Sequence, residues 1–328
     1  MVAARPRDSL HQAEGRRDLA GYSPTQKAIQ GKEYSLTVRR VCLGELSIMS
    51  SEAKVAGHYG QGRLEELILG AVAREGKDPE NLTAGDLAGV DEFHVGGLEA
   101  TQELAKQMEL RAGLRLLDVG SGIGGPARYF AGEHGCRVTG IDLTEEFVRV
   151  AGTLTKRTKL DGLAEFRQGS ALEMPFERDT FDGAYMIHVG MNIADKAGIF
   201  REVRRVVKAG GLFTIFDIVS TGGGRTGGGT IRYPVPWALS EETSFVGTRG
   251  KYREALQKAG FEIVQERGRA AFGIEFTERV MARMAQGGPP ALGLHLLMGE
   301  KTPMMIKNIL VMMKGGVLEP VELQARAV

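Results

Sequence analysis

The stretch that decides the fold runs from Leu114 to Gly125 and reads Leu-Arg-Leu-Leu-Asp-Val-Gly-Ser-Gly-Ile-Gly-Gly. Its first six residues form a short, largely apolar run between glycines, which is typical of a buried strand. The glycines that follow allow the backbone to turn tightly and to approach a ligand closely. A helix predicted over residues 125–134 would point its free N-terminal amides at that ligand. The stretch therefore predicts a strand, a ligand-binding loop and a helix.

Strands and helices are predicted to alternate beyond this stretch. Short apolar runs and amphipathic runs take turns up to residue 219. Such alternation favours parallel strands joined by helical crossovers. We therefore predict an α/β fold: a Rossmann-like, doubly wound, mostly parallel seven-stranded sheet with helices on both faces and an N-terminal helical cap. The predicted strands are 114–119, 137–142, 164–168, 181–189, 212–219, 261–266 and 317–325, and the predicted helices are 63–75, 97–109, 125–134, 145–159, 195–207, 249–258, 275–286 and 303–313.

The chain divides into residues 1–48, which are polar, and a body from residue 49 to 328, in which apolar residues recur with the periods of helices and strands. Residues 1–48 are Arg-rich and lack sustained periodicity, so we expect either a disordered tail or a start assigned too early, with Met49 as the natural start. Helical patterning begins only after Met49. The expected divisions of the body are a helical cap at 49–112, a main domain at 113–328, and within that domain an acceptor lid at about 220–250 and 270–313.

Charge and cysteine content exclude several classes of protein. The net charge of +1 gives no broad basic field for nucleic acid. No apolar run approaches the roughly 20 residues that span a bilayer, so no integral membrane association is expected. Two cysteines, Cys42 and Cys136, are too few for a disulfide framework. We expect a cytoplasmic protein whose partner is a small molecule.

Two acidic residues indicate the kind of cofactor that the loop would hold. Asp142 ends the second predicted strand, 22 residues after Gly120, where an acid suits the hydroxyls of an adenosine ribose. The glycines also satisfy the G-x-G-x-x-G pattern of dinucleotide-binding proteins, so a nicotinamide-dependent oxidoreductase is a second hypothesis. Asp118 speaks against it, because a carboxylate two residues before Gly120 would repel a pyrophosphate. S-adenosylmethionine has no phosphate and carries an ammonium and a sulfonium, so Asp118 favours this cofactor.

Four short motifs lie at matching points of the predicted sheet. They are the loop run from Leu117 to Gly125, Gly140-Ile-Asp-Leu143, Phe181-Asp182, and Val207-Lys-Ala-Gly-Gly-Leu212, in which Ala209 replaces a usual proline. Together they resemble the motif set of class I S-adenosylmethionine-dependent methyltransferases, and the similarity covers residues 55–328. The cofactor contacts that the resemblance implies in the loop and second strand are Asp118, Gly120, Ser121, Gly122, Gly124, Asp142 and Leu143.

A block upstream of the sheet narrows the resemblance. Tyr59 and the run His94-Val-Gly-Gly-Leu-Glu-Ala-Thr101 are similar to the small-molecule subgroup of these enzymes. That subgroup includes glycine/sarcosine-type and phosphoethanolamine N-methyltransferases and tocopherol- or quinone-type C-methyltransferases. In it, the aromatic residue and the Gly-Gly turn close over the methionine part of the cofactor. The resemblance therefore implies that Tyr59, Gly96 and Gly97 contact the cofactor.

Two positions depart from the family pattern. Ser170, before Ala171, stands where the family often has an aspartate that accepts from the adenine amino group. The hydroxyl of Ser170 can still accept a hydrogen bond, without the strength that a charge adds. Asn192 stands where the phosphoethanolamine enzymes carry a catalytic histidine, which argues against a phosphobase acceptor. Ser170 and Ala171 remain expected cofactor contacts.

Three side chains are candidates for accepting a proton. Methyl transfer from a sulfonium relies on positioning, and it needs a base only if the acceptor arrives protonated. The resemblance places His188, after the fourth strand, beside both cofactor and substrate, and an imidazole suits a base at neutral pH. His94 is the second candidate and Tyr59 the third. No pair of histidines or acids has ligand spacing on a predicted helix, so no metal site is predicted.

The sequence leaves several functions open. The main hypothesis is methyl transfer from S-adenosylmethionine to a small molecule, with an amine slightly favoured. The alternative is C- or O-methylation of a hydrophobic quinone-, tocopherol- or lipid-like acceptor. Seven of the 13 methionines lie in residues 281–313, and methionine adapts to apolar shapes, while Tyr233–Trp237 adds rings to the expected lid. More distant hypotheses are the nicotinamide-dependent oxidoreductase and a non-catalytic cofactor-binding module.

Overall fold

The computed structural model describes residues 52–57, 62–222 and 229–328. Residues 48–328 cluster as one compact unit. The predictions for residues 1–48 and for Tyr59 lie outside the described residues, as does the part of the expected lid at 223–228.

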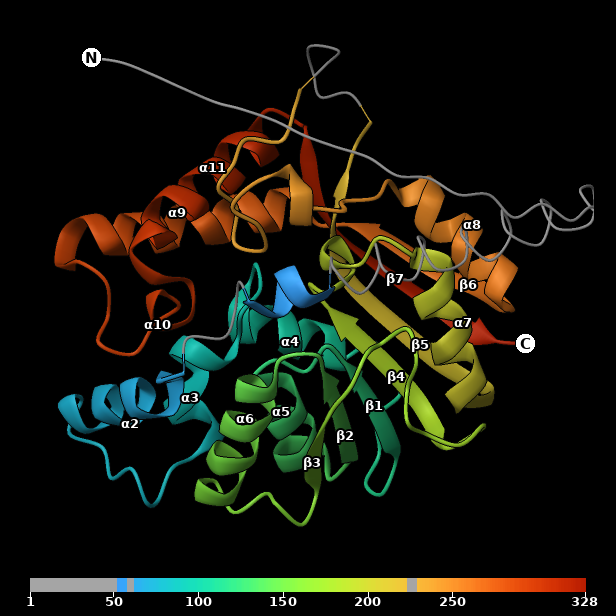
Figure 1. The fold of residues 1–328 in the computed structure, drawn as a ribbon, viewed down its shortest axis with the longest axis horizontal. Helices are drawn as coiled ribbons and strands as arrows, with labels where there is room; N and C mark the ends of the chain where they lie inside the picture. The colour runs from blue at the N-terminus through green and yellow to red at the C-terminus, as the bar shows by residue number, and fades with distance from the viewer. Residues whose placement is uncertain (1–51, 58–61, 223–228) are drawn as a thin grey trace, which may run out of the picture. The chain divides into compact units, whose positions relative to one another are not determined.

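A seven-stranded sheet organises the described part of the chain (Figure 1). Its strand order is β3-β2-β1-β4-β5-β7-β6, with the first five strands parallel and β7 antiparallel to both β5 and β6. This confirms the predicted mostly parallel, doubly wound sheet. The strands are β1 (Arg115–Val119), β2 (Arg137–Asp142), β3 (Ala164–Gln168), β4 (Phe181–Ile187), β5 (Val207–Ser220), β6 (Phe261–Gly268) and β7 (Leu318–Ala327).

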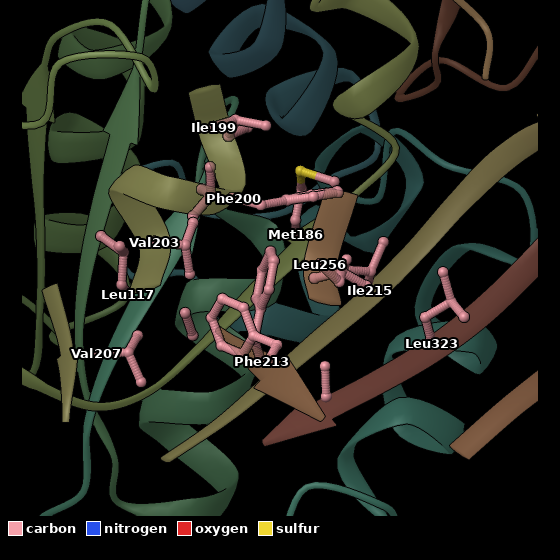
Figure 2. Close-up of a cluster of buried hydrophobic side chains, with 14 of the residues drawn as sticks. Leu117, Met186, Ile199, Phe200, Val203, Val207, Phe213, Ile215, Leu256 and Leu323 are labelled. Atoms are coloured by element: carbon pink, nitrogen blue, oxygen red, sulfur yellow. The ribbon is translucent and has the colours of Figure 1, made fainter. Parts of the chain in front are cut away.

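Helices cover both faces of this sheet, as the alternating pattern predicted. On one face, α7 and α8 pack on apolar side chains of β1, β4 and β5 (Figure 2). On the other face, α4 and α5 pack on side chains from the alternate positions of the same strands. The helices are α2 (Leu64–Arg74), α3 (Ala84–Asp91), α4 (Gly97–Ala105), α5 (Gly125–His134), α6 (Glu145–Arg157), α7 (Lys196–Val206), α8 (Arg249–Ala259), α9 (Ala270–Gly287), α10 (His295–Met298) and α11 (Thr302–Lys314).

The structure lengthens several predicted elements and adds two helices, α3 and α10, that were not predicted. Helix α3 was not predicted, because its glycines and acidic residues weaken the helical pattern of apolar residues. It begins with a capping box between Thr83 and Asp86. Helix α9 begins at Ala270 rather than residue 275. Strand β5 begins at Val207 rather than 212, because Val207 pairs with Phe181 ahead of an irregularity in the β4–β5 register.

The strand order places a ligand-binding edge at one end of the sheet. The chain runs outward from β1 to β2 and β3, and then crosses back to β4 on the other side of β1. At such a reversal, the loops that follow neighbouring strands diverge and leave a crevice. Here the crevice lies beyond Val119, which pairs with Ile141 of β2 and with Met186 of β4.

Candidate functional site

The loop after β1 is built from left-handed glycines. Gly120, Gly122 and Gly124 have φ values of 74°, 53° and 86°. A Cβ at Gly120 would lie 2.4 Å from Cγ2 of Val189, so a larger residue would collide with the loop after β4. At Gly122 a Cβ would meet no atom within 4 Å, because that side of the loop faces open space. The loop thus holds its backbone close to whatever occupies the crevice.

The crevice contains a cavity of about 130 Å³ that is rich in carboxylates. Loop residues Gly120 and Ser121 line it, together with Leu143 after β2 and Ala171 after β3. Among the described lining residues there is no lysine or arginine. The acidic lining residues are Glu52, Asp91, Asp118 and Asp142.

Asp118 is the most deeply placed of these carboxylates. Its side chain is buried beside the Tyr185 hydroxyl, which interacts with it, and its Oδ2 has no partner of full hydrogen-bond geometry among the described residues. Burial raises the pKa of Asp118 to about 8. The hydroxyl of Ser121 in the same cavity likewise finds no partner within the described part of the chain. Buried polar groups are rarely left unpaired, so both atoms are suited to a polar, cationic ligand.

Asp142 is held by the backbone around it. Its Oδ2 accepts from the Gly122 amide at 2.8 Å and its Oδ1 from the Thr144 amide at 2.9 Å. Each carboxylate oxygen has a second lone pair, so Asp142 can also accept from ligand hydroxyls. Burial nevertheless raises the pKa of Asp142.

Glu52 places a carboxylate next to Ser170, the serine that follows β3. Ser170 Oγ donates to Glu52 Oε1 at 2.6 Å and accepts from the Leu172 amide at 3.0 Å. Glu52 lies in the helical segment 52–57 and lines the cavity, whereas Ser170 does not. The acid that the family pattern places after β3 is therefore supplied here from the N-terminal side.

His188 follows β4 in a left-handed conformation with φ of 54°. Its amide donates to the Phe216 carbonyl at 2.7 Å, which continues the pairing of β4 with β5 by one residue and fixes the backbone there. Nε2 has no hydrogen-bond partner among the described residues. Burial lowers the pKa of His188 well below its usual value, so the ring is neutral near pH 7. His188 lines the first cavity and also a second one.

His94 belongs to a buried hydrogen-bonded chain. Its Nε2 lies 3.1 Å from the Gly97 carbonyl oxygen and 3.2 Å from Thr101 Oγ1. Thr101 Oγ1 donates to Glu92 Oε2 at 2.7 Å, and that oxygen is 3.6 Å from His94 Nε2. Burial raises the pKa of Glu92 to about 8 and lowers that of His94 to about 4. The rings of His94 and His188 lie edge to face with centroids 5.8 Å apart.

The second cavity is larger, about 520 Å³, and mostly apolar. It shares Phe93, His94 and His188 with the first cavity. Helices α9, α10 and α11 form much of its wall, with Pro236 and Trp237 from the expected lid. Two of the seven clustered methionines, Met284 and Met298, line it, while Met305, Met312 and Met313 are buried in the packing of the helices.

The remaining expected cofactor contacts have other positions. Gly97 lines the second cavity rather than the first. Gly96 begins α4 with φ of 95°, and a Cβ there would lie 2.6 Å from Phe272, so this position serves close packing. Gly124 forms the left-handed N-cap of α5. Tyr59 lies outside the described residues.

Sequence reasoning missed Glu52 and Glu92. Glu52 is an isolated acid whose partner Ser170 lies 118 residues away, whereas Glu92 precedes the block from His94 to Thr101 and accepts a hydrogen bond from Thr101. A weak signal for Glu92 existed, because it stands two residues before the predicted base His94. Among the described residues, no group of three His, Cys, Asp or Glu side chains is arranged to hold a metal ion. The described helices include none long and apolar enough to cross a membrane.

Comparison with known proteins assigns the central part of the chain. Residues 117–215 match the family described as a methyltransferase domain. A sterol 24-C-methyltransferase (ERG6B) of Gibberella zeae is 36% identical over 118 residues, which is 36% of this chain and 31% of that protein. A 24-methylenesterol C-methyltransferase 2 of Arabidopsis thaliana is 30% identical over 197 residues, 58% of this chain and 54% of that one. The chain spans about a third to a half of the length of these relatives.

Solved structures share the fold at lower identity. The geranyl diphosphate C-methyltransferase of Streptomyces coelicolor aligns with a TM-score of 0.56 and 17% identity over 70% of this chain and 78% of that chain. The Haemonchus contortus phosphoethanolamine N-methyltransferase 2 aligns with a TM-score of 0.60 and 22% identity over 71% and 53%. A [4+2]-cyclase, SpnF, also shares the fold, with 24% identity and a TM-score of 0.56 over 70% and 80%. Residues 117–215 therefore match a methyltransferase domain, and the solved structures share the fold of the described part of the chain.

Proposed function

We propose that this protein transfers a methyl group from S-adenosylmethionine to a carbon atom of an apolar, lipid-like acceptor. The observation that carries the proposal is the wall shared by the two cavities. Phe93, His94 and His188 line both the small acidic cavity and the large apolar one. A methyl donor in the first cavity and an acceptor in the second would meet at these three side chains. Short distance and fixed orientation supply much of the rate of such a displacement.

The first cavity fits a cationic cofactor without phosphate. Its lining combines carboxylates with no described lysine or arginine, which disfavours the pyrophosphate of a nicotinamide dinucleotide. The unpaired Oδ2 of Asp118 suits the ammonium group of the methionine part. Asp142 suits the ribose hydroxyls, and Glu52 with Ser170 suits the adenine amino group. When bound, S-adenosylmethionine would supply an electrophilic methyl group on a sulfonium.

The second cavity favours a lipid over a small amine. Its volume of about 520 Å³ would be mostly empty around a molecule the size of glycine or phosphoethanolamine. Its wall is aromatic and aliphatic, and Glu92 is the only carboxylate among its described lining residues. The relatives named as sterol C-methyltransferases point the same way. The slight sequence-based preference for an amine is therefore replaced by the lipid alternative.

In this proposal, His94 takes the proton that C-methylation releases. A carbonyl oxygen only accepts hydrogen bonds, so the contact with Gly97 puts the hydrogen of the neutral ring on Nε2 and leaves the lone pair on Nδ1. When a carbon–carbon double bond attacks the methyl group, one bond forms, the carbon–sulfur bond breaks, and the neighbouring carbon becomes cationic. Loss of a proton to Nδ1 restores a double bond. Thr101 and Glu92 then stabilise the charged ring through Nε2.

The proposal is tested by identifying the product that carries a labelled methyl group. The purified chain is incubated with methyl-deuterated S-adenosylmethionine and, in separate reactions, a sterol with a side-chain double bond, a prenylated quinone, a lipid extract, and the amines glycine, sarcosine and phosphoethanolamine. Mass spectrometry should find the label carbon-bound in one of the lipid reactions. Label in the amines alone would overturn the acceptor class, and label in none of the reactions would overturn methyl transfer. Asp118→Asn serves as the control with an impaired donor site.

A further inference from the structure

The second cavity has two chemically different ends. Its wall follows one face of α9, on which Phe276, Val280 and Arg283 stand at positions i, i+4 and i+7. At the Phe276 end, a Cβ on Gly97 would lie 3.4 Å from Cζ of Phe276 and 3.9 Å from Cβ of Glu92. That end therefore adjoins His94 and the first cavity. Arg283 is seven residues further along the helix, roughly 10 Å away at the helical rise per residue.

Arg283 is a cation without a partner in the described structure. No ion pair or hydrogen bond of its guanidinium is found among the described residues, and the side chain is exposed at the cavity. One turn earlier, Arg279 differs, because it pairs with both Glu99 and Glu275.

We propose that the acceptor is an amphipathic anion whose carboxylate or phosphate group binds Arg283 while its apolar body lies along α9. The opposite end, beside Glu92, is buried and has no lysine or arginine among its described lining residues, so an anionic head group pairs only at Arg283 and the acceptor binds in one direction. A guanidinium at the solvent boundary binds carboxylate and phosphate in a bidentate way and keeps part of its hydration. The proposal rests on the proposed function, because it assumes that the second cavity is the acceptor site.

The chain contains its own reporter for this test. Trp237 is the only tryptophan, and it lines the second cavity. Dodecanoate, dodecyl phosphate and dodecanol are titrated against its fluorescence without cofactor. We expect both anions to bind about fivefold more tightly than the neutral alcohol, the scale of one exposed ion pair. Arg283→Gln should remove this preference and leave dodecanol binding unchanged. Arg279→Gln, on the same helix but paired with acids, is the matched control that should keep it.

The outcomes separate this proposal from the proposed function. Equal affinity of wild-type protein for dodecanol and for the two anions, or an unchanged preference in Arg283→Gln, would overturn the anionic head group even if methyl transfer is found. A preference for one anion only would identify the head group. A preference that depends on Arg283 in a protein that methylates nothing would overturn the methyltransferase proposal and leave the anion site standing.

Discussion

The two cavities that meet at His94 and His188 are built in different ways. The first is formed largely by the ends of neighbouring strands: residues at the ends of β1 and β2 and just after them supply its glycines and Asp118 and Asp142, while Glu52 and Asp91 reach it from N-terminal helices. The second is formed by side chains from α3, α4, α9, α10 and α11, which are far apart in the sequence. The first cavity is therefore positioned mainly by the sheet, whereas the shape of the second cavity depends on how the helices pack against one another. Changes in one cavity should therefore leave ligand binding in the other intact.

The largest expected effect is on turnover, from a change in the wall that the two cavities share. His94→Gln removes the lone pair at Nδ1 and should lower turnover by roughly a hundredfold to ten-thousandfold, the contribution of a positioned base. Calorimetric affinity for S-adenosylmethionine and Trp237 fluorescence titrations should both stay close to wild type. His188→Gln, which changes the other shared histidine, is expected to lose less activity. A larger loss in His188→Gln than in His94→Gln would contradict the assignment of the base.

Asp118→Asn should weaken cofactor binding in the first cavity without changing ligand binding in the second. Loss of the buried charge beside the cofactor ammonium should lower calorimetric affinity for S-adenosylmethionine about a hundredfold. Dodecanoate binding at Trp237 should not change. Asp182→Asn is the matched control, because Asp182 lies at the far end of the sheet and pairs with Lys208. Unchanged cofactor affinity in Asp118→Asn would refute the placement of the ammonium.

The pH dependence of cofactor affinity should follow the same carboxylate. Burial holds the pKa of Asp118 at about 8 in the free protein, so near pH 6.5 the group is protonated and must lose its proton to pair with a cation. Affinity should therefore rise by up to about tenfold per pH unit between pH 6.5 and 8 and then level off. The same calorimetric series on Asp118→Asn, which lacks this carboxylate, measures the pH dependence that comes from titration of the cofactor itself. An equal slope in wild type and variant would show that Asp118 does not titrate on binding.

The smallest effect is expected at the rim of the donor cavity. Glu52→Gln removes the charge that Ser170 contacts and should weaken S-adenosylmethionine binding about fivefold, the scale of a single hydrogen bond. Adding Ser170→Asp in the same chain restores an acid at the family position and should recover the affinity in calorimetry. Failure of the double variant to bind better than Glu52→Gln would place the adenine elsewhere.

The same contrast explains what could be predicted from the sequence. Strand periodicity and glycine punctuation located the sheet, and Asp118 and Asp142 were identified because strand ends converge at one edge. Helix α3 escaped because Gly85 and Gly89 lower its helical propensity, although a Cβ at Gly89 would lie 2.5 Å from the Leu292 carbonyl, so close packing requires glycine there. Glu52, Glu92 and Arg283 could not be assigned, because their roles depend on helix packing that leaves no short motif.

The position of β7 affects how the protein is made. Strand β7 lies between β5 and β6, although it follows both in the sequence. During synthesis, β6 leaves the ribosome without a neighbour, and one side of β5 stays unpaired until Ala327 has been added. At 5–20 residues per second, the 59 residues from Gly268 to Ala327 take roughly 3 to 12 seconds. Throughout that interval the nascent chain exposes unpaired strand edges, which are the surfaces at which strands of other chains can pair with it.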